Sequence, residues 1–413
     1  MKSKKWYKLD NIAKFYSFTN NNVPAIFRYS VTLTEEIEKD ILKEAIEKTM
    51  QEFPSFNCSL KRGVFWYYLE QSDKQIIVEE ENRPICDKMY HDGDDLLIRV
   101  NYYKNRINLE VSHILSDGRG SLILFKSLIY QYLKIKYKIK DLKPDDISSS
   151  YEKTENSFDK YYTGPKTRRV SKRKIYHDRG RKKKGTTYME YHISTKKVQE
   201  LAKKYHVTIT TLLIAVLIQA YQKRMHEIDK KKAIKIDVPV DLRSYFPSFT
   251  SRNFFGLITV IYDNNQSDDF EAILKSVDNQ LKEETTKDQL KIRMNQMIAV
   301  EKNVAVRIVP IIVKDFALRI ADNVINSSTT SSVSNIGKIT VDKKIESYIR
   351  NFNVLTTTKY LQLTICSYQD DLSIGISSRY TNNDVIKNFC RFFSENGIEG
   401  TININEESNY GEM

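Results

Sequence analysis

The spacing of apolar residues predicts a mixture of helices and strands in the first half of the chain. Between Thr34 and Pro54, apolar side chains recur every three or four positions, so we expect an amphipathic helix that begins at Thr34. A second helix with the same period is expected from Gly118 to about Lys134. Apolar and polar residues alternate in short segments between these helices, which predicts two hairpins over 56–60 with 64–69 and over 96–103 with 106–113.

The second half of the chain shows the same mixture. Strands are predicted over 188–193, 233–240 and 255–262, with a closing hairpin over 361–378. Helices are predicted over 195–205, 210–223 and 269–284, in long segments up to about 325, and after Asn383. Both halves therefore belong to the α/β class in its α+β form, with mixed, mainly antiparallel sheets covered by helices.

A segment without helical or strand period separates the two halves. Residues 141–185 are rich in Ser, Pro, Gly, Lys and Arg and contain few apolar side chains. A chain of 413 residues is also longer than one ordinary core and suits two domains of about 200 residues each. We therefore expect an N-terminal lobe over 1–165, a basic linker over 166–185 and a C-terminal lobe over 186–413.

The formal charge of +13 is concentrated in this linker. Residues 166–184 contain eleven Lys or Arg and a single acid, Asp178, whereas the rest of the chain is nearly neutral. Such a run is most often a solvated connection. The functional alternatives are a contact to the phosphates of coenzyme A, to an acidic carrier protein or to nucleic acid. Nucleic acid is the least favoured, because aromatic residues are sparse in the run and no nucleic-acid-binding motif is present.

The sequence lacks the features of membrane-spanning, secreted and metal-binding proteins. The longest apolar stretch, 212–218, is far shorter than the ~20 residues that cross a bilayer, and the basic N-terminus lacks the apolar core of a signal peptide. The four cysteines are scattered, without the spacing of a metal site. We expect a cytoplasmic protein with no membrane span, no disulfide and no bound metal.

One short motif carries candidate chemistry. His113, Asp117 and Gly118 form an HxxxDG pattern between a predicted strand and a predicted helix. In the strand, His113 shares its face with the apolar residues two, four and six positions before it. A lone histidine on an apolar face is most often a packed core residue. Here, however, a helix begins at Gly118 with free backbone N–H groups, which favours a general base beside an anion-binding helix end.

The HxxxDG pattern resembles the core signature of the superfamily of chloramphenicol acetyltransferases, peptide-synthetase condensation domains, plant acyltransferases and alcohol acetyltransferases. Segments 238–243, 253–256 and 334–337 resemble the arginine-bearing strand, the N-x-x-G segment and the second signature loop of alcohol-acetyltransferase-like members. The resemblance implies two chloramphenicol-acetyltransferase-like lobes that meet along a central channel. In two places the chain departs from its relatives: Ser112 replaces the second histidine of condensation domains, and Ser-Asn-Ile-Gly stands near the DFGWG loop of plant members.

The resemblance also assigns roles to the residues of the motif. His113 is the implied catalytic base, which takes a proton from an acceptor hydroxyl or amine as it attacks an acyl thioester. Asp117 is implied to be structural and paired with an arginine, for which Arg243 is the candidate; the alternative is a solvated helix N-cap. Gly118 is implied to allow close backbone approach, and the alternative is a plain turn glycine.

Substrate contacts are expected from the second half of the chain. Ser334, Asn335 and a backbone N–H beside Gly337 are candidate donors to the oxyanion of the reaction, or else parts of an ordinary strand end. Asn253 is either a turn-forming residue or a ligand contact near the channel.

These features predict an acyl-CoA-dependent O- or N-acyltransferase that has no permanently bound cofactor. Its partners would be acyl-CoA and a small-molecule acceptor, since no carrier domain is attached. Two alternatives remain open. The chain could be a free-standing condensation domain that uses carrier-protein thioesters, or a binding module of the same fold that performs no catalysis.

Overall fold

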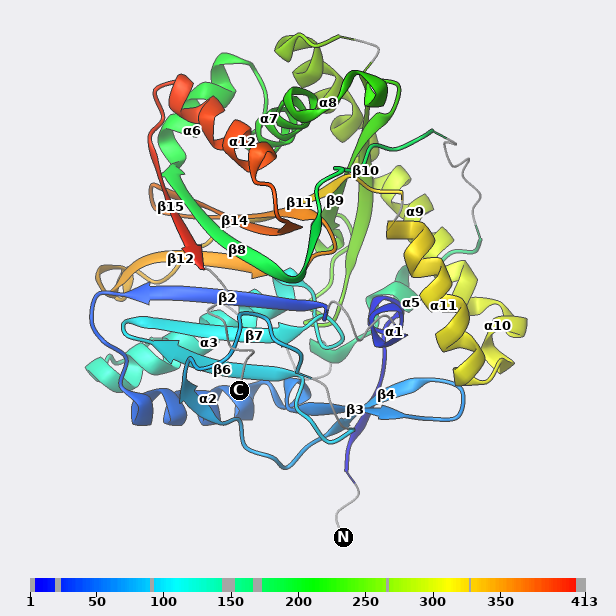
Figure 1. The fold of residues 1–413 in the computed structure, drawn as a ribbon. Coiled ribbons are helices and arrows are strands. Elements are labelled where there is room, and N and C mark those ends of the chain that lie inside the picture. Colours follow the sequence, from blue (N-terminus) through cyan, green and yellow to red (C-terminus); the bar gives the residue numbers. More distant parts are fainter. Residues whose placement is uncertain are drawn as a thin grey trace.

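Two mixed sheets, each covered by helices on one face, form two lobes that pack against each other (Figure 1). The computed structural model describes residues 4–18, 24–89, 93–142, 153–165, 173–264, 267–326 and 328–405. Each lobe has its own apolar core, one built mainly from the first half of the chain and the other from the second. The predicted fold class is confirmed, because most strand pairs are antiparallel and both lobes combine sheet with helix.

The first lobe contains the five-stranded sheet and the helices that cover it. Its elements are β1 (Trp6–Lys8), α1 (Asn11–Phe18), β2 (Ile26–Leu33), α2 (Lys39–Glu52), β3 (Cys58–Arg62), β4 (Tyr67–Gln71), β5 (Val78–Glu80), β6 (Ile98–Tyr103), β7 (Arg106–Ser112) and α3 (Gly118–Tyr137). The sheet has the order β12-β2-β7-β6-β5, and its first strand, β12 (Ile349–Thr356), comes from the second half of the chain. Helices α2 and α3 cover one face, and β1, β4 and β3 form a smaller sheet.

Local patterns predict this lobe in part. The hairpin of β6 and β7 and helix α3 are confirmed. The helix expected from Thr34 begins only at Lys39, so that boundary was wrong. The backbone N–H of Thr34 donates to Tyr348 and that of Ile37 to Lys104, and these tertiary bonds hold 34–38 outside the helix. Strand β2 is missing from the prediction although apolar and polar residues alternate over 27–33, so the sequence carried a strand signal that the prediction left out.

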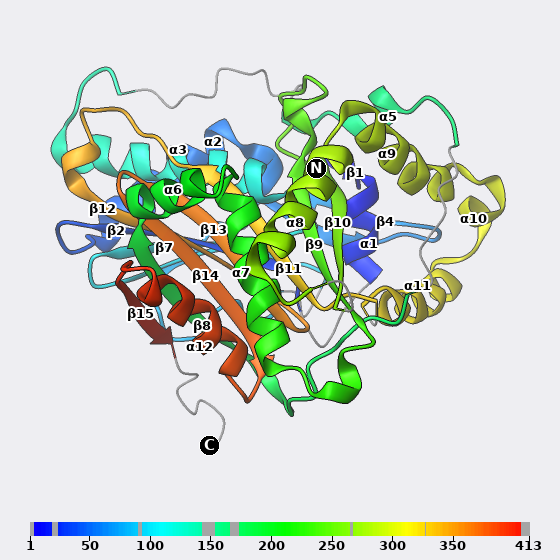
Figure 2. The same ribbon diagram turned by 90° about the horizontal axis from the view of Figure 1, so that it is seen from above.

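The second lobe is built on a seven-stranded sheet of order β10-β9-β11-β13-β14-β8-β15, in which β11 runs parallel to both of its neighbours. Helices α6, α7, α8 and α12 pack together over one face of it (Figure 1). Helices α9, α10 and α11 lie to one side, next to α1 and the β3–β4 hairpin (Figure 2). The elements are β8 (Lys182–Ser194), α6 (Thr195–Lys204), α7 (Ile209–Arg224), β9 (Ala233–Asp241), β10 (Phe255–Asp263), α8 (Phe270–Glu284), α9 (Lys287–Lys302), α10 (Val304–Ile308), α11 (Ile311–Asn326), β11 (Ser331–Lys338), β13 (Leu361–Tyr368), β14 (Asp371–Tyr380), α12 (Asp384–Glu395) and β15 (Gly400–Asn405).

The segment between the halves contains regular structure that its composition does not predict. Helix α5 (Ser157–Tyr161) buries Phe158 in the core of the second lobe, and Tyr176 is buried in the same core. Strand β8 already begins at Lys182, inside the predicted basic linker. Part of the basic run, 166–172, lies outside the described residues. The boundaries 1–165 and 186–413 stay a prediction, and β12 pairs across them with β2.

Among the described residues, no single helix has the length and apolar composition to cross a membrane. In the same ranges, only α6 and α7 taken together meet that test, with a bend of 82° between them.

Candidate active site

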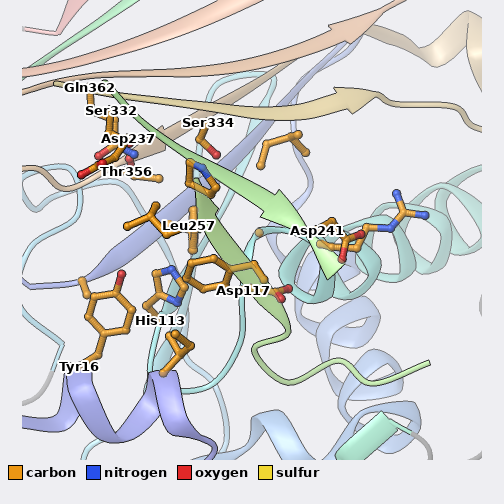
Figure 3. Close-up of a pocket in the computed structure, with 18 of the residues that line it drawn as sticks. Tyr16, His113, Asp117, Asp237, Asp241, Leu257, Ser332, Ser334, Thr356 and Gln362 are labelled. Carbon is orange, nitrogen blue, oxygen red and sulfur yellow. The ribbon is translucent and has the colours of Figure 1, made fainter. Parts of the chain in front are cut away.

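His113 lies where β7 ends, on the wall of a cavity of about 1180 Å³ between the two lobes (Figure 3). Its backbone N–H donates to the carbonyl of Ala25 at 2.8 Å, which extends the pairing of β7 with the β2 side by one residue. The imidazole stacks on Tyr16 with ring centres 4.3 Å apart, and Phe27 and Phe255 lie at 4.7 and 5.4 Å. Three aromatic rings from both lobes therefore orient the ring at the cavity wall.

The side chain of Asn253 holds one nitrogen of this imidazole. Asn253 Nδ2 donates to Asp10 Oδ2 at 3.1 Å and to the carbonyl oxygen of His113 at 3.0 Å. Both of these partners are acceptors, so the amide oxygen must face His113 Nδ1, at 2.8 Å. An amide oxygen can only accept a hydrogen bond, which places the proton of the neutral imidazole on Nδ1 and leaves Nε2 unprotonated.

The environment of His113 keeps its imidazole neutral. Burial among the aromatic rings lowers the pKa of His113 from 6.5 to about 4, although the carboxylate of Asp117 and the bond to Asn253 act in the opposite direction. At pH 7 the ring is therefore unprotonated on one nitrogen, as a general base must be.

Asp117 joins the two lobes beside the cavity. Arg243, at the start of the second-lobe segment after β9, donates to Asp117 through Nη1 at 2.9 Å and Nη2 at 3.2 Å. Asp117 also accepts from Gly120 N at 2.9 Å, as the N-cap of α3, and from Phe254 N at 2.7 Å. Its side chain is 4 % exposed. Asp117 thus caps the helix without being solvated, and its ion-pair partner is the arginine suggested by the resemblance.

The first turn of α3 packs closely against the second lobe. A Cβ on Gly118 would meet Ile336 Cδ1 at 2.9 Å, and the carbonyl oxygen of Gly118 accepts from the Tyr29 hydroxyl at 2.5 Å. A Cβ on Gly120 would lie only 2.2 Å from the carbonyl oxygen of Ser251. The HxxxDG pattern draws attention to Gly118, but the tighter contact is at Gly120, two residues later.

Only some of the candidate oxyanion donors line the cavity in the structure. Ser334 lies on the cavity wall and is labelled in Figure 3. Asn335 also lines the cavity, but its Nδ2 donates to the Thr210 hydroxyl at 2.8 Å and its Oδ1 accepts from Gly337 N at 2.9 Å. Gly337, with a φ of +90°, and Asn253 do not line the cavity. Both of the latter act within the protein: Gly337 in the bulge of β11 and Asn253 on the ring of His113.

The cationic side chains on the cavity wall are Arg119, Lys126, Arg243 and Lys359. Within the described part of the basic run, 173–184, no residue lines the cavity. No group of His, Cys, Asp and Glu in the described ranges has the arrangement of a metal site. The positive charge near the candidate site is therefore supplied by α3 and by the loops after β9 and β12.

The sequence analysis did not predict every residue that contacts the site. Asp10 precedes α1 and accepts from Ala13 N at 2.7 Å, which is an N-cap that the sequence could have shown. Its second contact, to Asn253, lies 243 residues away along the chain and has no local signal.

Solved structures share this fold over almost the whole chain. Polyketide synthase associated protein 5 from Mycobacterium tuberculosis matches with a TM-score of 0.64 and 13 % identity, covering 94 % of this chain and 96 % of its own. TRI101 of F. sporotrichioides, solved with coenzyme A and T-2, matches with a TM-score of 0.64 and 10 % identity over 96 % and 99 % of the two chains. The epimerization domain from the third module of tyrocidine synthetase B matches with a TM-score of 0.60 and 12 % identity over 95 % and 96 %.

No protein-family model matches the sequence, and no characterised protein matches it by sequence alone. At such low identities the structural similarity shows the fold and nothing finer. The chain therefore has the two-lobed fold that is also found in the TRI3 trichothecene 15-O-acetyltransferase and in the first condensation domain of the CDA synthetase.

Proposed function

We propose that the chain is an acyltransferase that moves an acyl group from acyl-CoA to a hydroxyl or amine, with Nε2 of His113 as the general base. One observation carries the proposal: a neutral imidazole, held through Nδ1 by Asn253, stands on the wall of a cavity of about 1180 Å³. Pockets that bind one small ligand usually measure about 300–1,000 Å³. The cavity thus has room for a donor and an acceptor side by side.

The proposed reaction needs no covalent enzyme intermediate. Nε2 of His113 takes the proton of the acceptor while the acceptor oxygen or nitrogen attacks the thioester carbonyl carbon. The C–S bond then breaks, and the departing thiolate takes the proton from the imidazolium. Ser334 on the cavity wall is our candidate donor to the oxyanion, and the pairing of two bound substrates supplies much of the acceleration.

Coenzyme A is the favoured carrier of the acyl group. Arg119, Lys126 and Lys359 on the cavity wall supply positive charge that suits its phosphates. Solved structures of the same fold include complexes with coenzyme A. An acceptor of the kind used by alcohol acetyltransferases fits the same proposal, since a hydroxyl is the group that Nε2 would deprotonate.

The decisive experiment compares wild type with His113→Ala on a panel of acyl-CoA donors with alcohols and amines, following the release of free thiol. His226→Ala, a change at an exposed histidine outside the cavity, is the control. The proposal predicts release by wild type and control but not by His113→Ala. Equal release by all three would refute His113 as the base, and no release by any of them would leave a binding module as the remaining interpretation. Transfer from carrier-protein thioesters but not from acyl-CoA would identify a condensation domain.

A further inference from the structure

The geometry points to Asp10 and Asn253 as positioning residues that hold His113 in the tautomer with an unprotonated Nε2. The inference rests on the proposed function, in which Nε2 is the base. Neither residue lines the cavity, so each would act only through the imidazole.

Asn253 is able to select the tautomer because its amide has two possible orientations. In the orientation present, Oδ1 accepts from Nδ1 of His113. If the amide turned over, Nδ2 would face Nδ1, the imidazole proton would move to Nε2, and the base would be lost. The orientation is decided by the acceptors on the other side of the amide, which are Asp10 Oδ2 and the carbonyl of His113.

Asp10 is itself held in place on both carboxylate oxygens. Oδ1 accepts from Ala13 N at 2.7 Å at the start of α1, and Oδ2 accepts from both the side chain and the backbone N–H of Asn253. The side chain is 3 % exposed, and burial raises its pKa to about 6. A neutral asparagine would cap the helix equally well without this desolvation cost. Residue 10 is a carboxylate because both of its oxygens must accept hydrogen bonds, one of them from Asn253.

Asp10→Asn provides the test. With its oxygen on Ala13, the substituted side chain would turn its NH₂ group toward Asn253 and force that amide over. We expect kcat to fall by about 100-fold or more, the usual contribution of a general base, with little change in KM. In ¹⁵N spectra the His113 proton should move from Nδ1 to Nε2. Asp10→Asn with Asn253→Asp should restore the Nδ1–H tautomer and part of kcat, because the new carboxylate accepts from both neighbours.

The matched control is Asp229→Asn, which neutralises another buried aspartate outside the cavity. It should keep the wild-type kcat and tautomer. An Asp10→Asn protein with wild-type kcat and the proton still on Nδ1 would overturn the inference. If the wild type transfers no acyl group at all, the proposed function fails, but the tautomer in the variants still decides whether Asp10 and Asn253 control the ring.

A second inference comes from an exposed apolar face formed by α10, α11 and the tip of the β3–β4 hairpin. We infer that this face docks on an anionic lipid surface. Four residues of α11, at positions 312, 313, 316 and 320, fall within about 100° of one another around the helix and form one stripe. They are exposed, as are neighbours in α10 and at the tip of the β3–β4 hairpin. The outer patch comprises Val64, Phe65, Ile308, Ile312, Val313, Phe316 and Ile320, and Phe316 is 69 % exposed.

Hydrogen bonds hold the helix and the hairpin of the outer patch together as one surface. Ile311 N donates to the carbonyl of Val64 at 3.1 Å, and Lys314 Nζ donates to the carbonyls of Phe65 and Arg307. The opposite side of α11 is therefore fixed to the hairpin, which leaves the apolar stripe outward. A water-exposed stripe of this kind is the reverse of what a packed surface helix shows.

The charges around the outer patch favour a lipid bilayer with anionic headgroups. Arg62 and Arg307 are exposed beside the apolar side chains, and Arg62 also contacts the carboxylate of Asp315 at 3.8 Å. The buried ammonium of Lys314 lies 3.6 Å from the Trp66 ring centre beneath them. An apolar helical face with cations at its border suits the boundary between headgroups and acyl chains. Because α11 also packs on α1, whose Phe15 and Tyr16 line the cavity, this position would bring the site close to lipid.

Co-sedimentation with vesicles tests this second inference. Wild type should bind vesicles that contain phosphatidylglycerol and not vesicles of phosphatidylcholine alone. Phe316→Glu should weaken binding by about tenfold or more, as expected for a fully inserted Phe. Ile228→Glu changes an equally exposed residue, 70 % exposed, elsewhere in the chain and should have no effect. Absence of vesicle binding at low salt would overturn the inference. So would a dimer that Phe316→Glu dissociates, because the patch would then bind a second copy.

Discussion

Replacing Arg243 with Met keeps a long apolar side chain but removes the guanidinium that links the lobes at the site. In the structure this group donates to Asp117 and to Asp241, the latter at 2.8 Å. It also donates to the carbonyls of Thr250 at 3.0 Å and Arg252 at 2.7 Å. The change therefore leaves a buried carboxylate without its cation and two backbone acceptors without a donor.

The size of the effect follows from these contacts. Asp117 would still accept hydrogen bonds from the backbone N–H groups of Gly120 and Phe254, so its negative charge would remain partly stabilised. Removing one partner of a buried pair typically costs ~3–5 kcal/mol. For a chain of this length, that cost lowers Tm by roughly 3–10 °C, depending on whether the lobes unfold together. Acyl transfer should fall as well, because the segment tied down by Arg243 carries Asn253.

Thermal unfolding of Arg243→Met, Asp117→Asn and the double variant measures the pair. We expect the double variant to be less destabilised than the sum of the single changes, because the second change removes a charge already left unpaired. Arg379→Met is the control, since Arg379 also donates to two carbonyl oxygens but does not line the cavity. Additive effects, or an Arg243→Met protein that melts with the wild type, would refute the reasoning.

Three further outcomes are expected. The pKa of His113 in the folded chain is about 4, below its ordinary 6.5, so the unfolded chain binds the proton more readily. This ring therefore lowers the stability of the fold as pH falls from 6.5 to 4. In a plot of Tm against pH, His113→Gln should not show that loss. The effect of pH on stability is reversed for Asp10, because its folded pKa of about 6 lies above its ordinary 3.8. Its stabilising contribution is therefore lost as pH rises through 6. Asp10→Asn should gain in Tm relative to wild type above pH 6 while losing activity. If the gap between the two melting curves does not widen as pH rises, this assignment is wrong. Gly120→Ala should destabilise far more than Gly118→Ala, because its Cβ would meet a backbone oxygen at 2.2 Å rather than the end of an isoleucine side chain at 2.9 Å; equal melting temperatures would contradict this.

Most elements with a clear period were predicted, and boundaries set by distant hydrogen bonds were not. The hairpin of β6 and β7 and the helices α3 and α8 follow from the spacing of apolar residues alone. Strand β2 does alternate over 27–33 and could have been predicted, whereas the start of α2 is displaced by backbone bonds to Lys104 and Tyr348. In the low-complexity segment, single aromatic residues such as Phe158 pack into a core that their neighbours in sequence do not indicate.

At the site, the motif located the candidate base but not the residues that orient its ring. A strand that ends in His113 and a helix that begins after Asp117 are local features, and the resemblance suggested Arg243 as the partner of Asp117. The role of Asn253 differs from the expected ligand contact, because its amide is already engaged by His113 and Asp10. Nothing local shows this, since the three residues come from separate parts of the chain.

The order of residues by itself determined that the chain alternates helix and strand in two halves and that a titratable ring stands beside a helix start, because backbone periodicity and capping act over a few residues. Only the tertiary structure decided which nitrogen of His113 carries the proton, which carboxylate holds Asn253, and which apolar stripe of α11 faces outward. Hydrogen-bond partners more than a hundred residues apart are brought together by the packing of whole sheets, and short-range patterns do not record that packing.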